Sequence, residues 1–563
     1  MMATDLTIKK LDMKNKSNIF NVSSLLLLCL IFTMFIGCNK DDEQNFEKTR
    51  LFRPVLNEDL FAEGNTIIVN MGNLKQAIGY VIEVSRDTFA TIDYTIQSDT
   101  SYVKIDENTV GEELFWNTLY QVRATALESD PEFNSKISDL GNVRTEVFPS
   151  ILNSPSTYDV TDIAARVTWD TINDGAPVTG IKVFSATDLK LKTPLFEETP
   201  VSTNEDDAGE AFVYGLSPET AYQIAIYSDS EIRGWVNYTT KVAGIDPNAP
   251  GVIDLSNSED RNAVSAAISA ANDGDIILVK RGVEYDAPGL KLNKSLTIRG
   301  AYGFTPNKAR LLFPSNFDLE DGSNVDHIRF VDLEIRGTDW GSKYVMNIGT
   351  TATLNEFSFD NCYITNFRGI FRQKDNPSVV NNYIINNSVV DSINGYGVAA
   401  CDKNTAMLKN IQLTNSTFNH TIYFLISQNN SESVLIDNCT LANINESGRQ
   451  IFRWRGGDGK NNVTNGITIS NSIFGHSWDK NNSEVLSSRG REGLDNTTFD
   501  IRNTYTVSDF SWTSNPIEAL PIGNAGSTQE QLWVDPENNN FNIKDSGFPG
   551  KYDSGDPRWR TKL

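Results

Sequence analysis

Histidine and cysteine are scarce in this chain, whose 563 residues include three histidines and five cysteines. The cysteines are too few for a disulfide scaffold, and none has the short spacing of a zinc site. Basic residues are outnumbered as well, 49 against 73 acidic ones, which leaves a net charge of −24. Because contacts to phosphates need a basic surface, nucleic acid is excluded as a partner.

Long apolar runs are also absent, except for Leu25–Phe35, which follows four lysines and ends close to Gly37-Cys38. The run is shorter than the roughly 20 residues that a membrane-spanning helix needs. A small residue before a cysteine at this place resembles the signal peptide of bacterial lipoproteins. The resemblance implies removal of residues 1–37 and attachment of lipid to Cys38. An ordinary secretory signal or uncleaved anchor, with Cys38 incidental, is the alternative.

The segment Asn39-Lys40-Asp41-Asp42-Glu43 opens a short tether, residues 38–50. A lysine followed by acids resembles the surface-export signal of Bacteroidota lipoproteins. It implies a lipid-anchored protein on the outer face of the outer membrane. A solvated acidic linker without any targeting role is the alternative.

Two β-sandwiches are predicted next, over residues 51–148 and 149–243, from short alternating segments rich in β-branched and aromatic residues. In the second, Arg166-Val167-Thr168-Trp169 and Leu216–Ile224 resemble a core strand and the tyrosine corner of fibronectin type III domains. The counterpart in the first, Leu114–Val122, lacks the proline. Such modules are typically spacers or docking surfaces.

Residues 244–256 form a predicted linker, and residues 257–563 a predicted right-handed parallel β-helix with a C-terminal tail. An amphipathic helix over 262–271, followed by Gly274–Val279, resembles the N-terminal cap of pectate-lyase-like β-helices. A cap is physically required, because the first coil otherwise exposes an unpaired sheet edge. The fold class predicted for the whole chain is all-β.

The β-helix prediction rests on a pattern of alternating apolar residues around one amide, repeated at intervals of 23 to 33 residues. A solenoid tolerates such an irregular period because insertions leave through its turns. After each amide the alternation shifts phase, which indicates a bend. A stacked asparagine suits a bend because its amide can satisfy turn backbone and pair with the next coil. The predicted ladder, a structural feature, consists of Asn361, Asn387, Asn415, Asn438, Asn471 and Asn503, with Asp332 in a weaker first copy.

The tail segment Gly555-Asp556-Pro557-Arg558-Trp559 resembles the ending of β-helix lipoproteins from Bacteroidota polysaccharide-utilisation loci. The resemblance extends over the whole mature chain. It implies a genomic setting rather than a reaction, because that family has no settled activity.

Basic residues share one face of the strand that follows each bend. If these strands stack in register, Arg372, Arg453 and Arg489 form a ridge on an otherwise acidic protein. Arginine forks suit carboxylate or sulfate groups and aromatic faces suit sugar rings, which predicts a site for an anionic polysaccharide. In the alternative, these arginines pair with nearby acids. The candidate binding residues are Arg372, Lys374, Gln428, Arg453, Trp454, Arg455, Arg489 and Arg491, with Trp340, Tyr344, Tyr396, His420 and Tyr423 as borders.

The same groove is also a candidate for β-elimination on a uronate glycan. Arg372 or Arg453 would neutralise the carboxylate, and Lys374, Tyr396 or His420 would act as the base. If the chain is a lyase, the pectate-lyase-like resemblance implies that Ca²⁺ neutralises the carboxylate of the substrate. No cluster of acids for this ion is evident, and no metal site or other cofactor is predicted. Paired acids for hydrolysis and a Ser-His-Asp arrangement are likewise not evident.

Three hypotheses follow. The first is a surface lipoprotein that binds polysaccharide, of plant or algal origin, for a neighbouring glycan-uptake complex. The second is a polysaccharide lyase that uses the same groove, and the third is a structural surface protein without ligand.

Overall fold

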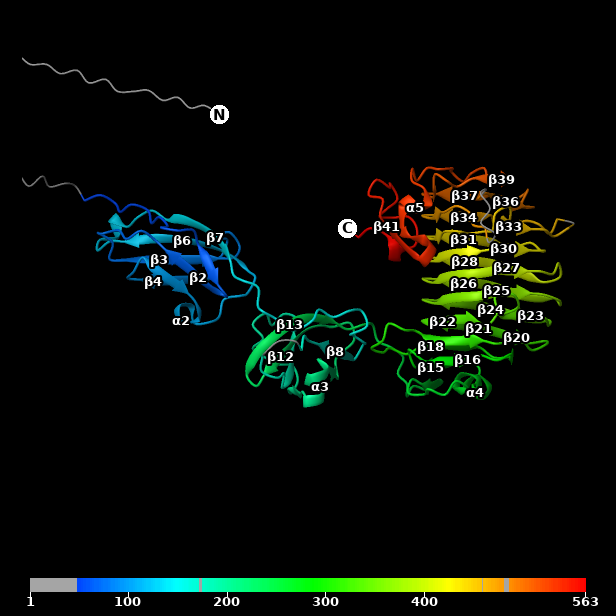
Figure 1. Ribbon diagram of the computed structural model, residues 1–563, viewed down its shortest axis with the longest axis horizontal. Coiled ribbons are helices and arrows are strands. Elements are labelled where there is room, and N and C mark those ends of the chain that lie inside the picture. Colours follow the sequence, from blue (N-terminus) through cyan, green and yellow to red (C-terminus); the bar gives the residue numbers. More distant parts are fainter. Residues whose placement is uncertain (1–47, 172–174, 458, 480–485, 563) are drawn as a thin grey trace, which may run out of the picture. The chain divides into compact units, whose positions relative to one another are not determined.

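The computed structural model describes residues 48–171, 175–457, 459–479 and 486–562 (Figure 1). It divides into two compact units, Met1–Phe148 and Pro149–Leu563. The signal peptide, Cys38 and nearly all of the tether lie outside the described residues. No helix among the described residues is both long and apolar enough to cross a membrane.

The first unit is a β-sandwich, as predicted. One sheet has the order β4-β3-β6-β7 and the other β1-β2-β5, and all pairs within them are antiparallel. The core between them contains Ile82, Tyr120 and Val122, all fully buried. The elements are β1 (Phe61–Glu63), β2 (Thr66–Asn70), β3 (Gly79–Ser85), β4 (Tyr94–Ser98), β5 (Tyr102–Ile105), α2 (Glu107–Val110), β6 (Leu119–Leu127), η2 (Pro131–Phe133) and β7 (Ser138–Arg144).

The second unit begins with another antiparallel sandwich, whose sheets have the orders β10-β9-β12-β13 and β11-β8. Trp169 lies in its core, as predicted. The elements are β8 (Ala164–Thr168), β9 (Gly180–Ser185), β10 (Thr199–Pro200), α3 (Thr203–Ala208), β11 (Glu210–Tyr214), β12 (Ala221–Ser228) and β13 (Glu231–Thr239).

Both sandwiches contain a tyrosine corner. The hydroxyl oxygen of Tyr222 accepts a hydrogen bond from the N–H of Ser217 at 2.9 Å, as the sequence predicts. Tyr120 accepts one from the N–H of Phe115, also at 2.9 Å. The first module therefore forms the same corner without the proline.

Parallel strands stacked in two long sheets form the solenoid (Figure 1). A ten-stranded first sheet contains the segment before each anchor asparagine. A fourteen-stranded second sheet contains the segments after it and has two runs, which meet in the long strands β25 and β27. The first sheet consists of β14 (Val252–Leu255), β15 (Asp275–Val279), β18 (Leu296–Gly300), β21 (Asn324–Val331), β24 (Ala352–Asp360), β26 (Ser378–Asn386), β28 (Met407–Thr414), β31 (Ser433–Asp437), β34 (Ile467–Ser470) and β37 (Phe499–Arg502).

The second sheet lies beside the first, and apolar side chains from both fill the space between them. Its first run is β16 (Glu284–Asp286), β19 (Ala309–Phe313), β22 (Leu333–Gly337), β25 (Tyr363–Gln373), β27 (Val389–Cys401), β29 (Thr417–Thr421), β32 (Thr440–Leu441), β35 (Ile473–Phe474) and β38 (Tyr505–Thr506). Its second run is β23 (Tyr344–Ile348), β25, β27, β30 (Leu425–Ser427), β33 (Gln450–Trp454), β36 (Ser488–Glu492) and β39 (Trp512–Ser514). Two further strands, β17 (Lys291–Leu292) and β20 (Asp318–Leu319), pair with each other.

The anchor asparagines make the bend between the two sheets. All six have positive φ, between 42° and 54°, and so does Asp332 at 55°. Asparagine tolerates this left-handed conformation better than most residues, which explains its recurrence. The amides do not all pair with the neighbouring anchor. Asn503 donates to Asn471, but Asn415 donates to Asn386, the residue before an anchor.

A helix covers one end of the solenoid and the chain's tail lies along its side. Helix α4 (Ala263–Ala270) buries Val264, Ala267 and Ile268 against the first coils, as a cap requires. In the tail, Asp556 accepts a hydrogen bond from Thr417 at 2.7 Å, and its N–H donates to Thr440. The tail elements are α5 (Gln529–Leu532), β40 (Trp533–Asp535), η3 (Pro536–Asn538), β41 (Asn540–Ile543) and η4 (Pro557–Trp559).

Candidate functional site

The second run of the large sheet brings the candidate arginines together. Arg372 is aligned with Ala400, Ala400 with Ile426, and Ile426 with Arg453. Arg372 and Arg453 therefore share one column, three strand spacings or about 14 Å apart. We call the face around this column the arginine–tyrosine surface. It consists of Tyr344, Arg368, Arg372, Tyr396, Tyr423, Arg449 and Arg453.

Guanidinium groups stack on tyrosine rings at both ends of this column. At one end, Arg372 lies 4.1 Å and Arg368 4.8 Å from the ring centre of Tyr396. Tyr344 meets Tyr396 edge to face, with centroids 5.6 Å apart. Such stacking holds a guanidinium flat and leaves the edge with its N–H groups open to a ligand.

At the other end, Arg453 and Arg449 lie 5.1 and 5.4 Å from the ring centre of Tyr423. Arg449 also donates to the Tyr423 hydroxyl at 3.0 Å. Arg368 and Arg449 were not predicted as site residues. The signal was present, because each lies four residues before an arginine that was named.

Carboxylates occupy part of the surface. Asp402 accepts hydrogen bonds from Arg372 and Arg455 at 2.6 Å each, and from Gln428 at 3.0 Å. Arg453 pairs with Glu492 at 2.8 Å. The ridge is therefore not a row of free cations, and a polyanion must compete with these acids.

Two polar atoms at the Arg372 end lack partners. Among the described residues, neither the buried Nε of Arg372 nor the buried Oδ1 of Asn347 has a hydrogen-bond partner. The two residues are aligned on neighbouring strands. Unpaired buried polar atoms are costly, and a ligand hydroxyl or carboxylate is one way to satisfy them.

Several predicted residues lie elsewhere. Trp454 was wrong as a glycan contact: it is fully buried, because it continues the inward-facing column of Gln373 and Ser427. Arg489 was expected above Arg453 but is aligned with Gln450, three positions away. It remains exposed and donates to Ser514 at 3.1 Å.

Two other basic residues at the edge of the surface have local acidic partners. Lys374 pairs with Asp375 at 3.3 Å, and Arg491 with Asp495 at 2.9 Å. Both acids are largely exposed, so each pair is weak and screened by salt.

Of the predicted lyase residues, Arg372 and Tyr396 lie together, but His420 does not join them. Burial raises the pKa of the bordering Tyr344 to about 12, although Arg372 and Arg368 oppose the shift, and this makes its phenolate harder to form. His420 lines a separate hollow with Trp340 and Trp478. No group of three or more His, Cys, Asp or Glu in the described part of the chain is arranged to hold a metal ion.

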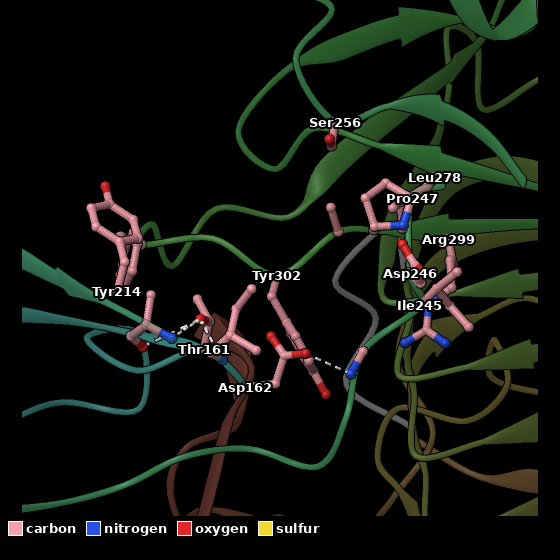
Figure 2. A pocket seen from close by; sticks show the side chains of 16 residues that line it. Thr161, Asp162, Tyr214, Ile245, Asp246, Pro247, Ser256, Leu278, Arg299 and Tyr302 are labelled. Carbon is pink, nitrogen blue, oxygen red and sulfur yellow. Dashed lines mark hydrogen bonds between the residues drawn. The ribbon is translucent and has the colours of Figure 1, made fainter. Parts of the chain in front are cut away.

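A further hollow, of about 490 Å³, lies within the second unit near the start of the linker (Figure 2). Its lining is mainly apolar and includes Tyr302 and Arg299, whose buried Nε has no partner among the described residues. Asp162 accepts a hydrogen bond from the N–H of Gly244 at 2.8 Å, drawn in Figure 2. A side chain at Gly244 would contact both Asp162 and Tyr302, so this close approach favours glycine. The sequence did not indicate this hollow.

Two families match the solenoid. One, described as a domain of unknown function (DUF4957), matches residues 283–423. The other, also described as a domain of unknown function (DUF5123), matches residues 434–559. No curated protein matches the chain.

Among solved structures, the chain is similar to the crystal structure of chicken CNTN1 FN1-FN3 domains. The identity is 14%, over 34% of this chain and 69% of that chain, with a TM-score of 0.15. A similarity at that level says nothing about function.

Proposed function

We propose that this chain is a polysaccharide-binding protein of the cell surface, and that the arginine–tyrosine surface binds an anionic glycan along the solenoid. The observation that supports the proposal most is the shared column of Arg372 and Arg453, with tyrosine-stacked guanidiniums at both ends. The surface offers forks for carboxylates and aromatic faces for sugar rings.

The charge of the rest of the protein favours this placement. With a net charge of −24, most of the chain repels a polyanion. A local basic face on an acidic protein therefore orients the glycan and makes its binding depend on salt.

The proposed setting follows the sequence resemblances. The N-terminal segment would be a lipoprotein signal, with lipid on Cys38 and the protein on the outer face of the outer membrane. The sandwiches would act as spacers, and the glycan would pass to a neighbouring uptake complex. Replacing Cys38 by Ser should move the protein from the membrane to the soluble fraction and abolish labelling with a fatty-acid analogue.

Affinity gel electrophoresis tests the binding proposal. Pectins, alginate, ulvan and glycosaminoglycans should retard the wild-type chain, and a neutral glucan should not. The double variant Arg372→Ala, Arg453→Ala should lose the retardation. Arg329→Ala, which removes an arginine paired with Glu356 on the first sheet, is the matched control and should retain it. Retardation by no member of the panel would favour a structural protein.

A lyase remains the second candidate because Arg372, a carboxylate neutraliser, stacks at 4.1 Å on Tyr396, a phenol of the type that serves as a base. A rise in ultraviolet absorbance from unsaturated uronate products, lost in Tyr396→Phe, would establish it. Binding of the same glycan without that rise would leave a binding protein.

A further inference from the structure

The hollow that contains His420 is built differently from the arginine–tyrosine surface. It measures about 280 Å³ and is lined by Trp340, Asp391, Ser392, His420, Trp478 and Glu537. Asp391 and Ser392 lie on β27 and His420 on β29, while Glu537 comes from η3 in the tail. Segments more than a hundred residues apart in the sequence therefore close around one small space.

Hydrogen bonds hold the polar groups of the hollow in place. Asp391 Oδ1 lies 3.3 Å from Nδ1 of His420, and Asp391 Oδ2 accepts from Asn539 at 3.3 Å. Nε2 of His420 lies 3.5 Å from the amide nitrogen of Asn443, and 3.8 Å from a Glu537 oxygen, which is too far for a hydrogen bond. The imidazole and the Asp391 carboxylate are thus fixed by neighbours on both sides, as in a preformed binding site.

Backbone geometry and aromatic contacts add to this picture. Ser392 and His420 both have positive φ, 58° and 46°, because they lie at a second bend of the coils, where Asn366 and Asn443 also have positive φ. Trp478 meets the His420 ring edge to face at 5.3 Å and donates its N–H to the carbonyl of Thr421. Trp340 also lines the hollow, and its buried N–H has no acceptor among the described residues.

This set of groups suits an uncharged sugar ring. Indole walls pack against the C–H groups of a sugar, and carboxylates and imidazole hydrogen-bond to hydroxyls. The unpaired Trp340 N–H would find an acceptor in a hydroxyl oxygen. Among the described residues, no arginine or lysine lines the hollow, and the carboxylates of Asp391 and Glu537 oppose a uronate or a sulfate.

We propose that the His420 hollow is a subsite for one neutral sugar ring. Strand β27 also carries Tyr396 of the arginine–tyrosine surface, five residues beyond Asp391. The bend at Ser392 lies between them, so the neutral subsite lies at the bend that leads into the anionic surface and is next to that surface along the chain. Resting on the proposed function, this identifies the ligand class as a heteropolysaccharide with neutral units beside anionic ones.

Methyl glycosides of neutral hexoses and 6-deoxyhexoses, each tested beside the corresponding uronate, probe the subsite directly. Binding to the full chain is measured by calorimetry and by saturation-transfer NMR. At least one neutral glycoside should bind, and bind more tightly than its uronate. Trp340→Ala should weaken it about tenfold, a loss typical of a packed aromatic contact.

Glu537→Gln changes an exposed carboxylate, so it tests the site even if Trp340→Ala does not fold. It should weaken the neutral glycoside roughly threefold. Tyr552→Ala, which removes an exposed aromatic ring outside the hollow, is the control and should change nothing.

The two proposals fail separately. If no neutral glycoside binds, or if Trp340→Ala and Glu537→Gln both bind as tightly as wild type, the subsite is overturned whatever the polyanion does. If neutral glycosides bind as expected while acidic polysaccharides do not, the subsite proposal is supported and the proposal of an anionic-glycan surface is refuted. The double variant Arg372→Ala, Arg453→Ala should leave the neutral glycoside unaffected.

Discussion

Asp402 is the residue whose replacement tests the anionic surface most informatively. Its carboxylate bridges Arg372 and Arg455 at 2.6 Å each, and its side chain is only 11% exposed. Replacement by Asn keeps the size and an acceptor for Gln428 but removes the charge. The two arginines then lose the anion that competes with a glycan carboxylate.

The change affects stability and affinity in opposite directions. A hydrogen bond to a charged group is worth about 1 kcal/mol more than a neutral one, and Arg455 is one-third exposed, so Asp402→Asn should destabilise the fold by about 1–2 kcal/mol. A like charge about 8 Å from a bound carboxylate costs about 2 kcal/mol at an intermediate dielectric before screening. Affinity for a uronate polysaccharide should therefore rise about tenfold at low salt.

The assay is calorimetric titration with a uronate oligosaccharide at two salt concentrations. The gain should shrink at high salt, because the removed repulsion is electrostatic. The control is Asp500→Asn, which makes the same change of charge in an acid paired with Arg502 on the first sheet. Its affinity for the oligosaccharide should rise much less. Unchanged or weaker binding by folded Asp402→Asn would refute the idea that these arginines receive the glycan.

Three further predictions concern the fold. In the ladder, Asn415→Ala should lower the free energy of unfolding by about 2 kcal/mol and Asn415→Gly by about 1, because glycine accepts the φ of 50°. Hydrogen exchange of the adjoining strands measures both losses, and equal losses would contradict this explanation. Burial raises the pKa of Asp556, so the neutral form stabilises tail docking at acid pH and this contribution is lost as pH rises above about 4. Asp556→Asn should then stabilise docking of the tail at neutral pH but not at acid pH, which hydrogen exchange of the tail at both pH values measures. A less stable tail at neutral pH would contradict this prediction. Burial also raises the pKa of Cys362 to about 12, so iodoacetamide should label it, by mass spectrometry, only after unfolding; native labelling would contradict its burial.

Much of the fold was readable from the sequence because the signals are local and repeated. Alternation around Asn361 and its counterparts marks strands with a buried face, and the phase break marks the left-handed bend. The corner tyrosines Tyr120 and Tyr222 were visible for the same reason, because each makes its hydrogen bond only five residues away.

The site was readable only in part. Parity along a strand correctly placed Arg372 and Arg453 on one face, since the coils between them are short. The position of Arg489 was predicted wrongly, because a long loop follows Trp454 and the sequence does not show which residue of the next strand is aligned with Arg453. Parity also places Trp454 opposite Arg453, and thus inside, so its burial was predictable.

The remaining features depend on contacts between distant residues. Asp402 meets Arg455 across 53 positions of the chain, and His420 approaches Glu537 only because the tail folds back along the solenoid. No pattern in the sequence encodes such pairings, because each depends on how many residues the intervening turns contain.

The most direct test is a crystal structure of the protein with a bound uronate-containing oligosaccharide. We expect carboxylates to lie within hydrogen-bonding distance of Arg372 and Arg453, with sugar rings against Tyr396 and Tyr423. An oligosaccharide bound on another face, or with its carboxylates directed away from both arginines, would contradict the account.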